Sequence, residues 1–224
     1  MAAITLARAY QHSFDAHPHL TLSVTGGCLN ALGDAVAQVS QNVVNKNKDQ
    51  DFTKRYDFQR TVRFFCFGLC ISPVMGRWNA FLERRFPLRS IAASSNSKVS
   101  MKALTKRVAA DQLIMAPIGL GIFLGSMGIM ERRSPGQIRD RFKDLYPTAL
   151  IANWKVWPPA QFVNFRYMPL PYRVPFSQLC GVIWTLYLSI LNSEEGKSQD
   201  KIEEIKHHIG EELQEIDKIK RKKY

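Results

Sequence analysis

Three long stretches without any charged residue constrain the fold of this chain more than any other feature of its sequence. Residues 16–33, 112–130 and 174–193 contain no Asp, Glu, Lys or Arg, and each stretch has 18 to 20 residues. A helix of about 20 residues crosses a hydrocarbon core about 30 Å thick. The alternation of apolar and polar residues that indicates strands is not found. We therefore predict an all-α integral membrane protein.

Two further stretches compete to complete the helix bundle. The charge-free stretch 64–76 is too short to span alone, and it reaches spanning length by including Arg63 or Arg77. Either guanidinium group can then snorkel to the headgroups or pair inside the bundle. The stretch 146–168 contains Lys155 and Arg166, which suits a polar span or an interfacial helix. We predict about four membrane-spanning helices.

Charge is segregated along the chain, which explains why its mean hydropathy is only -0.18. Residues 1–192 carry 23 Lys and Arg against 10 Asp and Glu, and residues 193–224 carry 8 against 9, from totals of 31 and 19. A basic body suits loops that face anionic lipid or a nucleotide-rich compartment. No nucleic-acid motif and no basic groove interleaved with aromatic residues occurs, so no nucleic-acid partner is expected.

Residues 193–224 form a separate, charged segment. Apolar residues recur along it every three or four positions, at Ile202, Ile205, Ile209, Leu213, Ile216 and Ile219. This spacing predicts an amphipathic helix of about 25 residues, which docks on its own chain, pairs through residues 200–220 with a helical partner, or lies on the membrane surface. We divide the chain into a membrane-embedded helical domain, 1–192, and a charged helical tail, 193–224.

A polar stripe runs along the first predicted span. Asn30, Asp34 and Gln38 recur every fourth residue on a helix otherwise made of small and apolar residues. Asp34 has no basic residue within four positions, so no partner on its own helix can neutralise it. It pairs with a cation of another helix, such as Arg63 or Arg77, faces a water-filled path, or is protonated.

Polar residues also lie within the later apolar stretches. Asp111 is followed by Gln112 and has Arg107 one turn before it, so we expect Arg107 to satisfy it locally. Trp154, Trp157, Gln161 and Asn164 follow at steps of three and four, which places two indoles and two amides on one helical face. Side chains of this kind require partners on neighbouring helices.

No pattern in the sequence indicates an enzyme, a cofactor or a metal site. Gly119-Leu120-Gly121 lacks the third glycine of a dinucleotide motif and the lysine of a phosphate loop, and Gly121 and Gly125 instead form a Gly-x-x-x-Gly packing step. No Ser/His/Asp or Cys/His set is recognisable. The cysteines lie in apolar segments without zinc spacing, so we expect small buried residues, with a redox-responsive pair as the alternative, at Cys28, Cys66, Cys70 and Cys180.

The amino-terminal residues contain a weak targeting signal. Residues 3–14 predict a short amphipathic helix before Pro18, compatible with an uncleaved mitochondrial route. No apolar core with a small-residue cleavage site is present, so a secretory signal is not expected. The final residues, Arg221 to Tyr224, do not match a peroxisomal Ser-Lys-Leu address.

A specific string of residues resembles a known family. Residues 154–165 read W-K-V-W-P-P-A-Q-F-V-N-F and are followed by Pro169, Arg173-Val174, Trp184 and Tyr187-Leu188-Ser189. Upstream matches are Arg8 to Gln11, Ala16 to Pro18, Gly33-Asp34, Gln38, Pro73, Trp78, Asp111-Gln112 and Pro117. The chain resembles the Mpv-seventeen and peroxisomal-membrane-protein-twenty-two family of small multi-span organelle membrane proteins. It departs from that family at Asn79, in the long connections 40–56 and 83–107, and in the tail after Asn192.

This resemblance implies a multi-pass protein of the mitochondrial inner membrane. It implies a channel or pore that supports small-solute passage, mitochondrial DNA maintenance and the stress response. The alternatives are a peroxisomal membrane pore and a non-conducting structural or scaffold protein. The partners considered are the lipid bilayer, a second copy of the chain and a helix for 200–220. The candidate pore-lining or interhelical polar residues are Asn30, Asp34, Gln38, Arg63, Arg77, Asp111, Gln112, Gln161, Asn164 and Arg173, with the signature aromatics Trp78, Trp154, Trp157 and Trp184.

Overall fold

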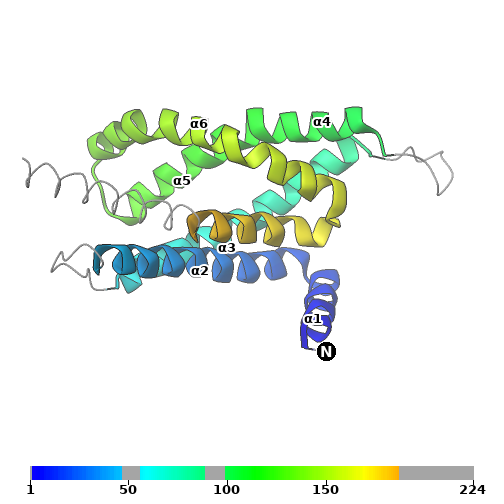
Figure 1. Cartoon of the computed structure of the whole chain (residues 1–224), viewed down its shortest axis with the longest axis horizontal. Helices are drawn as coiled ribbons and strands as arrows, with labels where there is room; N and C mark the ends of the chain where they lie inside the picture. The colour runs from blue at the N-terminus through cyan, green and yellow to red at the C-terminus, as the bar shows by residue number, and fades with distance from the viewer. Residues whose placement is uncertain (1, 47–55, 89–98, 187–224) are drawn as a thin grey trace, which may run out of the picture. The chain divides into compact units, whose positions relative to one another are not determined.

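The computed structural model describes residues 2–46, 56–88 and 99–186, and every regular element in these ranges is a helix (Figure 1). The predicted all-α fold is therefore confirmed. The elements are α1 (Ala2–Ala16), α2 (Pro18–Lys46), α3 (Phe58–Arg85), α4 (Met101–Ala110), the π-helical turn η1 (Asp111–Met115), α5 (Ala116–Met130) and α6 (Pro135–Tyr167). Residues 170–186 are also helical and form the unlabelled yellow-to-orange helix of Figure 1.

The predicted spans coincide with helices wherever the structure describes them, apart from residues at helix boundaries. The stretch 16–33 lies in α2 apart from its first two residues, 64–76 lies in α3, 112–130 lies in η1 and α5, and 146–168 ends at the close of α6. The stretch 174–193 begins inside helix 170–186. Within the described ranges, Met101–Met130 is the one helix long and apolar enough to cross a membrane by length and composition. The number of four spans stays a prediction.

Local signals set several helix ends. Asp57 caps α3 by accepting the backbone N–H of Arg60, and Ser100 caps α4 by accepting that of Ala103. The start of α6 has a full capping box, in which Ser134 and Gln137 exchange side-chain and backbone hydrogen bonds. These caps satisfy amide groups that a helix start leaves without partners.

The chain divides into two compact units. The main unit comprises residues 1–35 and 57–182, and the second unit comprises 36–56 and 183–224. The predicted domain boundary at 192/193 and the predicted tail helix, including 200–220, lie outside the described residues.

Small residues allow close helix contacts in the main unit. A Cβ atom on Gly68 of α3 would lie 2.4 Å from the carbonyl oxygen of Gly26 on α2, so glycine is required at this crossing. A Cβ atom on Gly128 would lie 2.7 Å from the Ile138 side chain, at the hairpin of α5 and α6. The ring of Phe123 fills the contact between α5 and α3, at 5.2 Å from the Phe67 ring centroid.

Apolar side chains cover the outside of the candidate membrane helix, whereas polar side chains lie inside. Leu113, Ile118 and Ile129 are 67%, 52% and 70% exposed, while Asp111 and Gln112 on the same helix are buried. This arrangement is the inverse of a soluble protein, and it suits a helix whose outer surface contacts lipid.

The expectation of buried cysteines is wrong. Cys28, Cys66 and Cys70 are exposed and Cys180 is half-buried. The face of α3 that packs against α2 is occupied by Gly68, so Cys66 and Cys70, two residues away on either side, point outward.

Candidate functional site

Asp111 is the centre of a buried hydrogen-bond network formed by three elements. Its Oδ1 accepts the indole N–H of Trp78 at 3.0 Å. Its Oδ2 accepts the side-chain amides of Gln112 and Gln161, both at 2.9 Å. Asp111 is only 7% exposed. Three N–H donors therefore satisfy this carboxyl group. Among the described residues, no cation is shown paired with it.

The expected pairing of Asp111 with Arg107 is wrong. Arg107 is buried, and it donates instead to the backbone carbonyls of Phe86 at 2.7 Å and Glu83 at 3.4 Å. These carbonyls belong to the last turn of α3, where a helix leaves oxygen atoms without intrahelical donors. The guanidinium group thus caps α3, and Asp111 takes neutral donors from other helices.

The network extends along α6 to helix 170–186. Gln161 Oε1 accepts the amide of Asn164 at 2.9 Å, and the same amide lies 2.9 Å from Ser177 Oγ and 3.2 Å from the carbonyl of Arg173. Arg173 pairs with Glu83 of α3 at 3.0 Å. Hydrogen bonds thus connect three helices around Asp111, as is typical of polar residues in membrane bundles.

The π-helical turn shapes this site. It places the consecutive residues Asp111 and Gln112 together in the interior, at 7% and 6% exposed. The indole of Trp154 on α6 donates to the backbone carbonyl of Gln112 at 2.8 Å. Single π-helical turns inside α-helices are frequent at functional sites.

A cavity of about 390 Å³ lies beside Asp111. Its lining comes from α2, α3, the η1–α5 helix, α6 and helix 170–186, all within the main unit. The polar residues of the lining are Asn30, Trp78, Asn79, Asp111, Gln112, Asn153, Trp157, Gln161, Ser177 and Gln178. A mostly apolar cavity of this size among helices, with a few polar groups in its lining, is the usual form of a small-molecule site.

Comparison with known proteins identifies the family. The model of the Mpv17/PMP22 family matches residues 128–189. Protein SYM1 of Gibberella zeae is 39% identical over 188 residues, which cover 84% of this chain and 97% of that protein. The chain belongs to the Mpv17/PMP22 family. Protein sym-1 of Neurospora crassa is 35% identical over 186 residues, 83% of this chain and 98% of its own length.

A further relative locates the protein in the cell. The mitochondrial inner membrane protein Mpv17 of Xenopus laevis is 35% identical over 185 residues, covering 82% of this chain and 95% of that protein. This Mpv17/PMP22-family chain is thus a protein of the mitochondrial inner membrane, as the resemblance implied. No solved structure matches the chain.

Asp34 forms an ion pair with another helix, which was one of the three predictions for this residue. Its partner is a different arginine from the two that the sequence suggested. Its Oδ1 lies 2.7 Å from Arg60 Nε, and its Oδ2 accepts the Thr61 hydroxyl at 2.7 Å. Arg63 and Arg77, which the sequence offered as examples of such a cation, are not the partners. The antiparallel register of α2 and α3 decides the choice, because Leu22 faces Gly76 and Asp34 therefore faces the start of α3.

Some of the remaining predicted residues line the cavity beside Asp111, and others lie elsewhere in the chain. Arg63 lies 3.5 Å from Asp57 at the start of α3, and Arg77 lines a different cavity, next to α1. Gln38 and Trp184 belong to the second unit. The predicted residues that line the cavity are Asn30, Trp78, Asp111, Gln112, Trp157 and Gln161.

Several polar residues of the site were missed in the sequence. Gln178 donates to Ser72 Oγ at 2.8 Å, and Ser72 donates to the carbonyl of Gly68 at 2.6 Å. Asn79 and Asn153 line the same cavity. A polar residue inside a charge-free stretch is a sequence signal that could have identified Ser72 and Gln178.

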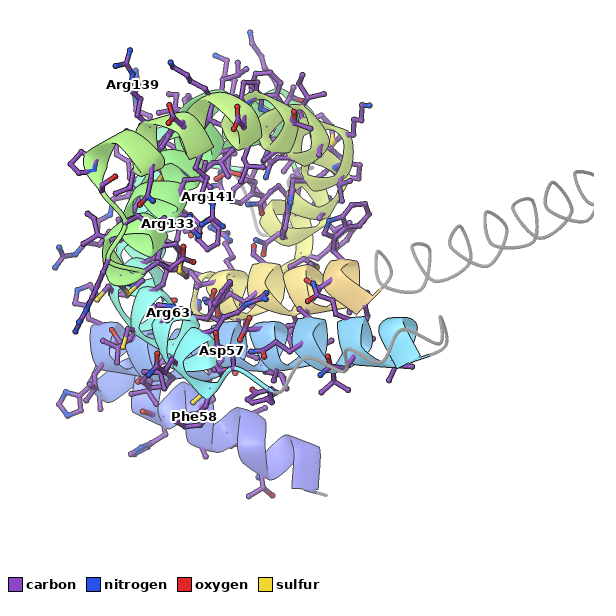
Figure 2. The ribbon with its side chains drawn as sticks, turned by 90° about the vertical axis from the view of Figure 1, so that its left-hand side faces the viewer. Asp57, Phe58, Arg63, Arg133, Arg139 and Arg141 are labelled. Carbon is purple, nitrogen blue, oxygen red and sulfur yellow. The ribbon has the colours of Figure 1, made fainter. Side chains whose placement is uncertain are left out.

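Basic side chains gather at one end of the main unit, where α3 begins and α5 turns into α6. Figure 2 shows Arg63, Arg133 and Arg141 on the side facing the viewer, with Arg139 pointing outward. Glu131 pairs with Arg133 and with Arg141, at 2.5 and 2.7 Å. Burial raises the pKa of Glu131, but the hydrogen bonds and charges of the two arginines outweigh it, so its pKa lies below the usual value.

Proposed function

We propose that this protein is a channel-like component of the mitochondrial inner membrane that allows small solutes to pass. The observation that carries the proposal is the cavity beside Asp111, which polar groups from five helical elements help to line, next to a candidate membrane helix whose outer surface is apolar. Polar groups are expensive inside a membrane, and they occur there mainly along solute and ion pathways. The cavity is proposed as the part of the path that contacts the solute.

The wider role follows from the family resemblance and belongs to the same proposal. Passage of small solutes would support mitochondrial DNA maintenance and stress tolerance by supplying the matrix. No catalytic step and no cofactor is part of this function. A homo-oligomer, and a helical partner for residues 200–220, would complete the path or regulate it.

A non-conducting scaffold is the second candidate. The hydrogen bonds of Asp111 favour it, since they join α3, η1 and α6 and would stabilise a purely structural bundle. The relative from Xenopus laevis argues against a third possibility, a pore of the peroxisomal membrane, because that relative is named as a mitochondrial inner membrane protein.

Reconstitution in liposomes separates the two candidates. We expect the purified full chain to release entrapped small uncharged solutes and to raise bilayer conductance above that of empty liposomes. Asp111→Asn should alter the ion preference of this conductance, whereas Asp140→Asn, a change at an exposed residue of α6, should not. Solute retention and conductance equal to those of empty liposomes would refute the channel and favour the scaffold.

A further inference from the structure

We propose that the cavity beside Asp111 binds small organic cations that carry N–H groups, such as primary ammonium ions. The inference rests on the proposed function, since it names the class of solute that the same cavity takes. It follows from an inventory of which hydrogen-bonding atoms the protein uses internally and which remain for a solute.

The amides around Asp111 have only one allowed orientation when this residue is ionised. A carboxylate group accepts hydrogen bonds and does not donate them. The Nε2 groups of Gln112 and Gln161 must therefore face Asp111, as they do at 2.9 Å. The Oε1 atom of Gln112 consequently points away from Asp111. Chemistry, and not an arbitrary choice between oxygen and nitrogen, fixes this assignment.

A serine fixes the orientation of Gln178 in the same way. Ser72 uses its single hydroxyl proton in a 2.6 Å bond to the carbonyl of Gly68. It can only accept from Gln178, whose Nε2 lies 2.8 Å away. The Oε1 atom of Gln178 is thus also left over.

Three buried oxygen atoms of the lining remain without a partner among the described residues. They are Gln112 Oε1, Asn153 Oδ1 and Gln178 Oε1, and all three residues line the cavity. All three atoms accept hydrogen bonds. Buried acceptors without partners are costly, so the occupant that suits this cavity must bring donors.

The charge of the cavity lining further restricts the class of solute that can bind. Among the described residues of the lining, Asp111 is the one ionisable side chain, and none is Lys, Arg or His. The lining also contains aromatic side chains, including Trp78, Trp157 and Phe123, and the face of an aromatic ring attracts a cation. A phosphate-bearing solute would bring negative charge and more acceptors, which the cavity disfavours. The volume of about 390 Å³ is at the small end of ligand sites.

Thermal unfolding of the full chain in detergent micelles tests the inference with three probes. Ethylammonium carries one positive charge and three N–H donors, tetramethylammonium carries the same charge without donors, and methyl phosphate carries negative charge. We expect ethylammonium to raise the unfolding midpoint in a saturable manner. Tetramethylammonium and methyl phosphate should leave the midpoint unchanged.

Variants at one acceptor link the effect to the cavity. Asn153→Ala removes an oxygen atom and should weaken the apparent affinity for ethylammonium about tenfold. Asn153→Asp keeps an oxygen atom and adds a negative charge, so it should bind ethylammonium more tightly. This variant tests the inference if Asn153→Ala does not fold. The matched control is Gln41→Ala, at an exposed amide of α2, which should not change the affinity.

The results distinguish this inference from the proposed function. Equal shifts with both ammonium ions, or no shift with any probe because water alone satisfies the oxygen atoms, would overturn the inference. Binding in micelles needs no path through the membrane, so saturable binding without conductance would support the inference and refute the channel. Conductance without discrimination between the ammonium ions would overturn the inference alone.

Discussion

The ion pair of Asp34 and Arg60 should respond asymmetrically to removal of its two partners. The Asp34 side chain is 0% exposed and the Arg60 side chain is 36% exposed. Arg60→Gln leaves a fully buried carboxylate without its cation, which typically costs about 3–5 kcal/mol. Asp34→Asn leaves a guanidinium group that can turn to water or to lipid headgroups, so we expect only about 1–2 kcal/mol.

A double-mutant cycle in micelles measures this asymmetry. The free energy of unfolding is obtained from denaturant titration of the wild type, both single variants and the double variant, and the double variant should lose less than the sum of the singles. Arg63→Gln is the matched control, because its partner Asp57 is 51% exposed and lies 3.5 Å away, and its cost should stay below about 1 kcal/mol. Equal costs for the two single variants, or a larger cost for Asp34→Asn, would refute the reasoning.

Three further predictions concern other parts of the chain. Gly128→Ala should destabilise by about 1–3 kcal/mol because its methyl group would meet Ile138 at 2.7 Å, whereas Gly119→Ala, with nothing within 4 Å, should cost nothing; denaturant titration compares them. The pKa of Glu131 is lower in the folded protein than in the unfolded chain. Its ion pairs therefore stabilise the fold above the unfolded pKa, and this stabilisation is lost as the pH falls through the folded pKa. The unfolding midpoint should therefore fall on acidification below about pH 4, and fall less in Glu131→Gln. Cutting the chain after Ser193 should leave membrane insertion intact, as alkaline extraction of membranes can show; loss of insertion would place the tail in the core.

The helices were predictable because their signal is local. Charge-free stretches of spanning length and the absence of strand alternation depend only on neighbouring residues, and the described part of each predicted span is helical except for single residues at helix boundaries. The capping residues Asp57, Ser100 and Ser134 are equally local. The sequence also identified Gln161 and Asn164 as residues that require partners on other helices.

Partner choice was not predictable because it depends on register and on which face of each helix packs. Asp34 pairs with Arg60, and not with Arg63 or Arg77, because the contact of α2 with α3 sets which turn lies opposite. Arg107 was expected to satisfy Asp111, but the open carbonyls at the end of α3 compete for its guanidinium group. No pattern within one helix contains this information.

The scaffold and the channel use different atoms of the same side chains. Around Asp111, the N–H groups of Gln112 and Gln161 bind the protein and stabilise the bundle. The oxygen atoms of Gln112, Asn153 and Gln178 remain in the cavity lining. A structural role alone explains the first set of atoms and leaves the second set with an unexplained cost. Gln112→Glu should therefore disrupt the bundle, because it replaces a donor to Asp111 by a second negative charge, whereas Asn153→Asp should leave the fold intact and change only what the cavity binds.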